Sequence, residues 1–470
     1  MNSLLLGGFI AAMATGLPIA LAMVLASLLY IWFSGSIPPL TVVHRMVGGV
    51  DSFPLLAVPF FILAGNLMNS AGITNRIYNF ALALVGWLKG GLGHVNVVGS
   101  VIFAGMSGTA IADAGGLGTI EIKAMKDHGY PTEFALGITA ASATLGPIIP
   151  PSLPLVIYGV QANVSIGRLF AAGFVPGILM ALFMMGMVAY YAHVRKYGSD
   201  IAFSWPRMGR AFFELGFVAV TAVALYFLWS HPDLPGWLRF GALLVGTMVA
   251  DKVFKFEAYM ALLTPVILIG GMATGLFTPT EAAVAAVAWA LFLGFGWYRT
   301  LSWRMIVKIS MDTIESTAVV LFIVAAASIF AWVLTTTRVT EAIAVWVLSI
   351  SDNPLVFLLL VNVFLLFVGC FMETIAAITI LVPVFMPIVA KLGIDPVHFG
   401  LVLILNLMIG LLTPPVGMVL FVLQKVARIS FEATVKAVLP WLWPLLVTLA
   451  LITYVPQLVL WLPNLIYGAK

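Results

Sequence analysis

The sequence predicts an all-α protein that crosses a membrane many times and consists of two related halves. Its 470 residues are 62% hydrophobic and only 9% charged, outside the usual range of soluble globular domains. Apolar runs long enough to cross about 30 Å of hydrocarbon recur along the chain, for example 174–191, 212–229, 262–277 and 439–460. Roughly a dozen such segments are visible. Glycines and prolines also recur at one fixed separation in the two halves.

The ends and the charges of the chain fit membrane insertion without a soluble domain. Residues 1–33 lack the positively charged n-region of a signal peptide and are too long for a cleavable signal, so we expect them in the mature structure. The single cysteine, Cys370, excludes an internal disulfide. A net charge of +4 is ordinary for a protein whose basic residues gather in cytoplasmic loops, and it predicts no nucleic-acid partner.

A basic connector divides the chain. The stretch HVRKYGSDIAFSWPRMGR carries Arg195, Lys196, Arg207 and Arg210, which predicts that it faces the cytoplasm. We therefore expect a first repeat over 1–194 and a second repeat over 258–470. Between them, 195–257 holds the connector and two further apolar segments.

The two halves match at a shift of 264 residues. The shift pairs Phe103 with Phe367, Gly105 with Gly369, Gly129 with Gly393, Gly146 with Gly410, Pro150 and Pro151 with Pro414 and Pro415, and Pro176 with Pro440. Chance is the alternative because glycine is common here, but the proline pairs lie in similar contexts, LGPIIPPS and IGLLTPPV. A duplicated chain with matching helix interruptions is typical of secondary transporters, which bind substrate and ions at those interruptions.

The proline pairs predict interrupted membrane helices. Pro150 and Pro151 remove two amide donors and disfavour helical backbone before them, so a helix must stop near Gly146. Carbonyls left unpaired at membrane depth are tolerated only where they line a polar cavity or bind something. Sodium, a hard cation, suits such oxygens. The alternative is a proline kink whose carbonyls are satisfied by serine hydroxyls or by neighbouring helices.

Upstream of each interruption, the pattern predicts a re-entrant hairpin. In 101–125 an apolar run is followed by a small, hydroxyl-bearing tip, Ser107 to Thr109, and by a second helical run. At the matching place in the second half, Glu373 and Thr374 form the tip. Small residues at the tips also fit plain helix packing. Asp113 and Glu373 are ionisable groups in apolar surroundings, which are either functional or paired with a lysine at the hairpin mouth.

These motifs resemble the large membrane subunit (M subunit, DctM type) of the tripartite ATP-independent periplasmic (TRAP) transporters. The resemblance rests on GMSGTAIADAGGLGTIEIKAMKDHGY, ITAASATLGPIIPPSLPLVIYG and SIGRLFAAGFVPGIL in the first half, and on GLFTPTEAAVAAVAWAL, GCFMETIAAITILVPVFMPI and LNLMIGLLTPPVGMVLFVL in the second. It implies two inverted repeats and elevator-type, sodium-driven uptake through a bacterial inner membrane. The implied substrate is a carboxylate such as a C4-dicarboxylate or a sialic acid, and sodium is co-transported. A periplasmic binding protein (P type) and a small four-helix subunit (Q type) are the implied partners.

The resemblance also implies site residues. The first sodium site would use Ser107, Thr109, Gly146, Ile149 and Pro151, and the second would use Gly369, Thr374, Gly410, Thr413 and Pro415. Residues beside the substrate would be Gly108, Pro150, Ser152, Glu373 and Pro414. The second site depends on the 264-residue symmetry, because Phe371 and Glu373 replace the hydroxyls of the first tip.

One segment departs from the family pattern. Residues 212–254 supply what look like two extra spans, where the family has a short connector. An even number of added spans keeps the downstream chain in its original orientation, and we expect both helices to enlarge the static scaffold.

The sequence lacks the motifs that other classes of function require. No GxxxxGK[ST] loop is present for an ATP-driven pump, and the six histidines form no HExxH pair for a metalloenzyme. A serine hydrolase built on Ser107 has no base in its segment, so we expect neither an enzyme nor an organic cofactor. An ion-coupled carboxylate transporter that works without a binding protein, and a channel, remain open.

Overall fold

The computed structural model describes residues 2–35, 37–230, 236–256, 258–273 and 276–468, and within these ranges the chain is helical without a β-strand element. The first half contains α1 (Asn2–Ala14), α2 (Ile19–Ser34), α3 (Leu40–Val50), the 3-10 turn η1 (Phe53–Leu56), α4 (Ala57–Ser70), α5 (Ile73–Val85), α6 (Gly91–Ser107), α7 (Ala110–Gly115), α8 (Leu117–Asp127), α9 (Thr132–Ala143), α10 (Leu153–Ala162) and α11 (Ile166–Val194).

The connector region contains α12 (Trp205–Ser230) and α13 (Gly236–Phe254). The second half contains α14 (Tyr259–Ala273), α15 (Pro279–Leu291), the π-helical turn η2 (Phe292–Trp297), α16 (Trp303–Thr336), α17 (Val339–Ile350), α18 (Pro354–Gly369), α19 (Thr374–Lys391), α20 (Pro396–Gly410), α21 (Met418–Ala427), α22 (Phe431–Val438), the 3-10 turn η3 (Leu439–Trp441), α23 (Leu442–Tyr454) and α24 (Gln457–Tyr467).

Seven helices in the described ranges are long and apolar enough to cross a membrane, or up to eight if the bent pair α17 and α18 is one span. The sequence predicts roughly a dozen apolar segments. The numbers differ because several of these segments form shorter helices of 10–17 residues, among them α6, α10, α20 and α21. These helices end inside the protein, at a hairpin tip or an interruption, so they are too short to span by themselves.

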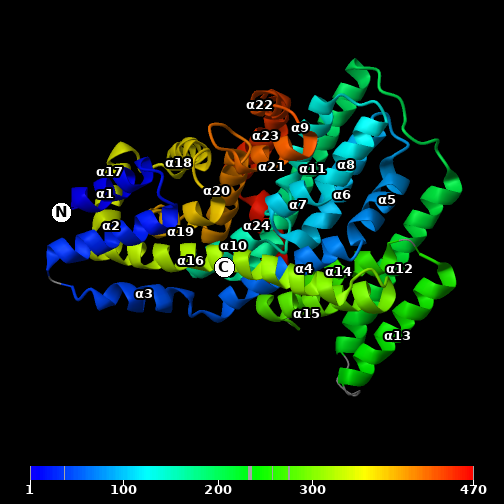
Figure 1. Ribbon diagram of the computed structural model, residues 1–470, viewed down its shortest axis with the longest axis horizontal. Coiled ribbons are helices and arrows are strands. Elements are labelled where there is room, and N and C mark those ends of the chain that lie inside the picture. Colours follow the sequence, from blue (N-terminus) through cyan, green and yellow to red (C-terminus); the bar gives the residue numbers. More distant parts are fainter. Residues whose placement is uncertain (1, 36, 231–235, 257, 274–275, 469–470) are drawn as a thin grey trace.

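Each half contains a helical hairpin followed by an interrupted helix, at the places the sequence indicates. In the first half α6 and the α7–α8 pair form the hairpin, and α9 and α10 flank the interruption. In the second half these elements are α18 and α19, followed by α20 and α21. Figure 1 shows how the halves interlock: α10 packs against α19, and α21 packs against α7. Each helix that follows an interruption therefore contacts the hairpin of the other half.

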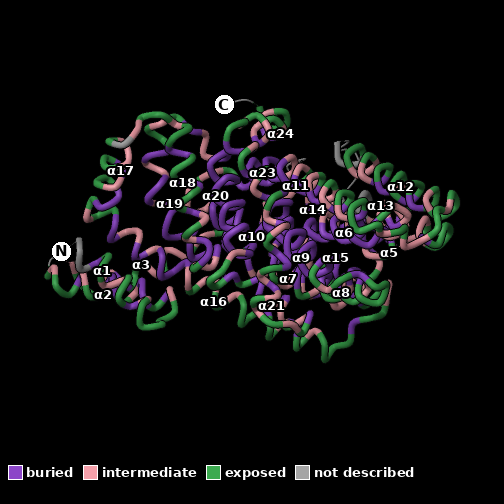
Figure 2. Tube along the Cα trace, turned by 90° about the horizontal axis from the view of Figure 1, so that it is seen from above, coloured by how far each residue is buried: buried purple, intermediate pink, exposed green. Residues whose placement is uncertain are grey.

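The interrupted helices form the centre of the molecule. All residues of α9 from Phe134 to Ala143 are buried, as are those of α20 from Val397 to Gly410 and of α10 from Leu153 to Gly159. Figure 2 shows this buried centre, with exposed residues concentrated on peripheral helices such as α2 and α12. A helix that is apolar and buried all round has no face left for lipid, so protein surrounds the helices that lead into both interruptions.

Longer helices surround this centre. The 34-residue α16, about 50 Å long at 1.5 Å per residue, packs against α2, α3, α4 and α19. On another side α11 packs against α23 and α24. The buried Arg168 of α11 donates to the Asn464 side chain of α24 (2.7 Å) and to the Gly468 carbonyl (3.1 Å). These contacts tie the end of the first half to the carboxyl-terminal helix.

The connector helices attach beside α5 of the first half and α14 of the second half. α12 packs against α5 and α14. Its buried Glu214 carboxylate accepts the Ala258 amide, and its Thr221 hydroxyl lies 2.6 Å from the Tyr259 hydroxyl at the start of α14. α12 is apolar and long enough to span a membrane, whereas a second crossing by α13 stays a prediction. Most of the turn predicted between them, 231–235, lies outside the described residues.

We expect deletion of 212–254 to leave a topology reporter fused after Arg299 on its original side, because two crossings are removed together. The deletion also removes the Glu214 and Thr221 contacts with α14, so assembly should be less efficient. The measurement is reporter accessibility in intact cells and in inverted vesicles. Deletion of 236–254 alone is the control and should reverse the reporter. A reporter that changes sides after the full deletion would show that the segment does not cross twice.

Candidate functional site

The tip of the first hairpin is shaped by Gly108 and Thr109. α6 ends at Ser107, and Gly108 turns the chain with a left-handed φ of +65°. The Thr109 hydroxyl then accepts the Ala112 amide (3.2 Å) and so caps α7. This capping satisfies one of the free amides at the start of α7. The turn therefore exposes the backbone of the tip to the interrupted helix.

The first interruption is an irregular stretch between Ala143 and Leu153. Ser152 caps α10 by accepting the Leu155 amide, and its hydroxyl donates to the Pro147 carbonyl. A serine hydroxyl thus satisfies one carbonyl of the interruption, as the kink alternative requires. The peptide bond between Pro150 and Pro151 is cis.

The first tip contacts the first interruption directly. The Leu153 amide donates to the Gly108 carbonyl (3.3 Å). A Cβ on Gly108 would lie 2.6 Å from the Pro151 carbonyl oxygen, and one on Gly146 would lie 3.2 Å from the Thr109 carbonyl oxygen. Two regions separated by about 40 residues of sequence therefore touch through backbone, and glycine allows the approach.

Of the five residues predicted for the first sodium site, four lie at this contact or beside it: Ser107, Thr109, Gly146 and Pro151. The Ile149 side chain instead packs toward Gly177 of α11, so only the Ile149 backbone could face a ligand. Of the residues predicted beside the substrate, Gly108, Pro150 and Ser152 are also buried here.

The second tip and interruption repeat this arrangement with different side chains. The Val416 amide donates to the Cys370 carbonyl (3.2 Å), and a Cβ on Gly369 would lie 3.0 Å from the Gly410 Cα. The Glu373 carboxylate caps α19 by accepting the Ile375 (2.8 Å) and Ala376 (3.1 Å) amides. Glu373 is therefore engaged with backbone and not with a lysine.

The residues predicted for the second sodium site are less buried than those predicted for the first. Gly369 and Gly410 touch, and Thr374 follows the tip directly. The Thr413 hydroxyl donates back to the Ile409 carbonyl (2.8 Å), and the Thr413 amide donates to the Gly410 carbonyl (3.0 Å). Pro414 and Pro415 are exposed, and their peptide bond is cis. The proline pair of the second interruption is thus exposed at the protein surface, whereas that of the first interruption is buried.

One hydroxyl at each tip is buried without a partner in the structure. These are Ser107 Oγ and Thr374 Oγ1, each on a residue that is 3% exposed. Within the described residues, the carbonyls of Gly146, Ile149 and Pro151 also accept no hydrogen bond. Buried polar atoms normally have hydrogen-bond partners. A group of unpaired oxygens at one place is therefore suited to coordinate a hard cation, which prefers oxygen ligands.

Sequence reasoning did not find the polar residues that hold each hairpin to its interrupted helix. In the first half the Ser142 hydroxyl of α9 donates to the Asn96 amide oxygen of α6 (2.7 Å). In the second half the Asn406 amide of α20 donates to the Asn362 amide oxygen of α18 (2.7 Å). Ser142 and Asn406 are themselves separated by the 264-residue shift. Single polar residues inside long apolar runs are the signal that could have found them.

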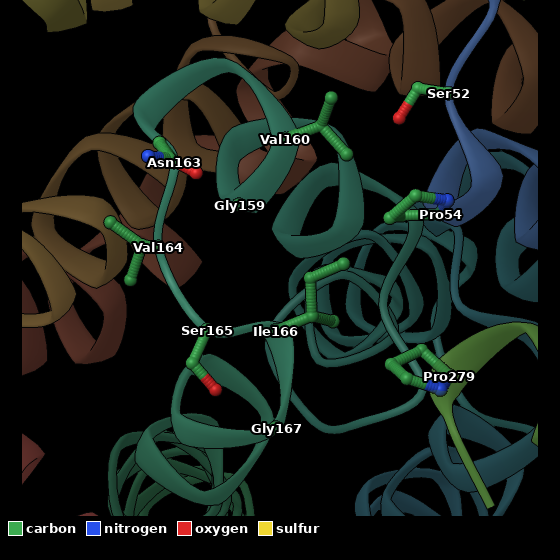
Figure 3. A pocket seen from close by; sticks show the side chains of 10 residues that line it. All are labelled: Ser52, Pro54, Gly159, Val160, Asn163, Val164, Ser165, Ile166, Gly167 and Pro279. Atoms are coloured by element: carbon green, nitrogen blue, oxygen red, sulfur yellow. The ribbon is translucent and has the colours of Figure 1, made fainter.

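A separate cavity of about 360 Å³ lies at the turn between α10 and α11. Figure 3 shows Asn163, Val164 and Ser165 on one side of it, facing Ser52, Pro54 and Pro279. No predicted site residue lines this cavity, which is bounded by η1 and by the start of α15.

Comparison with known sequences gives one consistent result. The family model described as "Tripartite ATP-independent periplasmic transporter, DctM component" matches residues 6–458. The sialic acid TRAP transporter large permease protein SiaM of Vibrio cholerae is 44% identical over 463 residues, covering 98% of each chain. The C4-dicarboxylate TRAP transporter large permease protein DctM of Pseudomonas aeruginosa is 38% identical over 414 residues, covering 88% of this chain and 87% of that protein.

Solved structures of low sequence identity share the fold. The YdaH transporter of Alcanivorax borkumensis aligns with a TM-score of 0.54 at 16% identity, covering 88% of this chain and 87% of that one. MtrF of Neisseria gonorrhoeae aligns with a TM-score of 0.52 at 14% identity, covering 88% and 84%. At these identities the likeness concerns the fold alone.

Gly108→Ala should destabilise the protein more than Gly129→Ala. Both glycines have a left-handed φ, which costs an alanine about 1 kcal/mol, but a Cβ at position 129 would meet nothing within 4 Å. At position 108 the Cβ would press on the Pro151 carbonyl, which adds about 1–3 kcal/mol of overpacking. Unfolding of both purified variants in detergent measures the difference. Equal losses of stability would show that the tip does not press on the interruption.

Proposed function

The chain belongs to the DctM component family of the tripartite ATP-independent periplasmic transporters, and from that premise we propose that it carries a small organic acid inward by sodium-coupled secondary transport. The membership rests on the family model over residues 6–458 and on relatives such as SiaM, which is 44% identical over 98% of the chain. The chain is a multi-pass protein of the bacterial inner membrane, with seven or more apolar helices of spanning length.

The proposed substrate class is a carboxylate. The relatives are named for sialic acid, for C4-dicarboxylates and, at 33% identity in Escherichia coli, for 2,3-diketo-L-gulonate. These three kinds of compound differ in size but share a carboxylate, whereas isethionate, for which a 36% identical relative in Oleidesulfovibrio alaskensis is named, carries a sulfonate instead. Specificity for one of them is assigned in this proposal to the binding protein, because no arginine occurs at either tip.

The observation that carries the sodium proposal is the buried tip that lies on unpaired backbone. At the first site we assign the Ser107 and Thr109 hydroxyls with the carbonyls of Gly146, Ile149 and Pro151. At the second site we assign Thr374 and Thr413 with backbone of Gly369, Gly410 and Pro415. The unpartnered hydroxyls of Ser107 and Thr374 support one ion at each tip. Both ions are cargo that moves with the substrate.

We assign the moving unit of an elevator to the two hairpins and the interrupted helices. Their mutual packing supports this division, since α10 contacts α19 and α21 contacts α7. The long α16 supplies the static part, together with the helices on the side of α16 that faces away from the hairpins and the interrupted helices. The carboxylate would lie between the tips, near Pro150, Ser152, Glu373 and Pro414.

Two protein partners complete the proposal. A small Q-type subunit is supported by the isethionate permease of Oleidesulfovibrio alaskensis, which is named DctMQ and of which this chain covers 65%. A periplasmic P-type binding protein is supported by the family description itself. A carrier that works alone and a channel are the outcomes that would replace this proposal.

Ser107→Ala and Thr109→Ala should each raise the sodium concentration that gives half-maximal uptake by about tenfold, the effect of about 1.4 kcal/mol of lost ligand binding. Maximal uptake should fall less, because alanine hardly changes the packing volume. The measurement is uptake against sodium concentration in reconstituted vesicles. Ser316→Ala, an exposed serine on α16, is the control. Unchanged half-saturation in both tip variants would remove the first site from the proposal.

The purified chain alone should not accumulate free substrate in liposomes, since substrate is proposed to arrive bound to a soluble protein. Uptake should appear when the small subunit and the loaded binding protein are both added, and it should saturate and require sodium. The measurement compares the four combinations at one sodium gradient. Saturable uptake by the chain alone would favour an independent carrier, and non-saturating flux would favour a channel.

A further inference from the structure

Glu121 is a buried carboxyl that the proposed transport sites do not use. It lies on α8, the second arm of the first hairpin, and is 1% exposed. Two glycines make room around it. A Cβ on Gly99 of α6 would lie 3.0 Å from Glu121 Oε1, and a Cβ on Gly118 would lie 2.7 Å from the Thr139 side chain of α9. The carboxyl is therefore enclosed by α6, α8 and α9.

A single amide fixes the Glu121 carboxyl in place. The Asn96 side-chain amide donates both to Glu121 Oε2 (2.5 Å) and to Thr139 Oγ1 (2.8 Å), and its oxygen accepts the Ser142 hydroxyl. The donors and the acceptor of Asn96 are thus engaged, and the orientation of its amide follows from its partners. The other Glu121 oxygen, Oε1, is buried without a partner.

No cation compensates a negative charge at Glu121 in the described part of the chain. The titratable group that acts on its carboxyl is Asp113 of α7, another buried carboxyl, which would carry the same sign if it were ionised. Tyr78 of α5, which carries no positive charge, is also coupled electrostatically to Glu121. α9 contributes Thr139, which does not titrate, and His94 lies two residues before Asn96, around the far side of α6. Lys126 turns away and donates to the Ala427 carbonyl (3.3 Å).

An ionised carboxyl in this position would be an uncompensated buried charge. Such a charge is expensive enough that a buried group takes up a proton instead. A metal ion is a poorer fit, because hard cations gather about six oxygens. Of the oxygens on Glu121 and on the neighbouring Asp113, Glu121 Oε1 and Asp113 Oδ2 are left without a hydrogen-bond partner, which is fewer than such a cation needs. A proton, in contrast to a metal ion, requires only one of these oxygens.

We propose that Glu121 is a proton-binding site, and that the neutral carboxyl holds both arms of the first hairpin against α9. α6 leads from Asn96 to the tip at Ser107, and α9 leads from Ser142 to the interruption at Gly146. The bound proton therefore fixes the two elements that meet at the first tip. Glu121 is a positioning residue that acts through Asn96, and its role does not require sodium coupling.

The test compares wild type with Glu121→Gln across about pH 5.5–8. The folded state holds a proton that the unfolded chain releases above its usual titration near pH 4.3, so the stability supplied by the proton falls as the pH rises. The unfolding constant of wild type, divided by that of Glu121→Gln, should rise about tenfold per pH unit. Chemical unfolding of the purified chain in detergent measures this ratio. Glu133→Gln, at an exposed glutamate of α9, is the charge-matched control and should follow wild type.

A ratio that stays constant with pH would overturn the proposal, since Glu121 would then be equally ionised in both states. If Glu121→Gln does not fold, infrared spectroscopy of wild type with isotopically labelled glutamate gives a second test at pH 8. Absence of a protonated glutamate carboxyl band overturns the site, and a band that persists in Glu214→Gln and in Glu373→Gln supports it. Neither readout involves transport, so failure here is distinct from failure of the sodium proposal.

Discussion

The structure depends on how backbone is satisfied where two helices are interrupted inside an apolar protein. A break at this depth leaves amides and carbonyls that neither lipid nor a continuing helix can pair. At both breaks a hairpin tip pairs with part of this backbone. The Leu153 amide donates to the Gly108 carbonyl, and the Val416 amide donates to the Cys370 carbonyl. Each tip must therefore stay on its interruption for the break to be tolerated. The proposed ion sites lie where this pairing is incomplete.

Holding a hairpin against an interrupted helix requires both polar and small residues. Asn96 with Ser142, and Asn362 with Asn406, join the first arm of each hairpin to the helix that precedes each break. Glycine allows backbone to approach backbone, as at Gly410, where a Cβ would collide with Gly369. Small residues with a few interhelical hydrogen bonds are what helix association within a membrane generally uses. The polar pairs also give each contact a direction that apolar packing lacks.

The two halves are related in plan but differ in detail. The first interruption is buried, whereas Pro414 and Pro415 of the second are exposed. The first tip carries hydroxyls at Ser107 and Thr109, and the second uses the Glu373 carboxylate to cap its own helix. One hydroxyl at each tip, Ser107 or Thr374, is nevertheless left unpartnered. The same order of hairpin and interrupted helix therefore occurs in two chemically distinct environments.

The sequence by itself determined the class of protein, the family and the places of the hairpins and breaks. It could do so because hydropathy, paired prolines and hydroxyl-bearing tips act locally on the chain. The apolar segments in the sequence outnumber the described helices of spanning length, because several of these segments form shorter helices that end at a tip or an interruption. Only the tertiary structure decided that Gly108 meets Pro151, that Ile149 turns toward α11, and that Glu121 is enclosed with Asn96. These are contacts between segments far apart in sequence, and packing, not local preference, selects them.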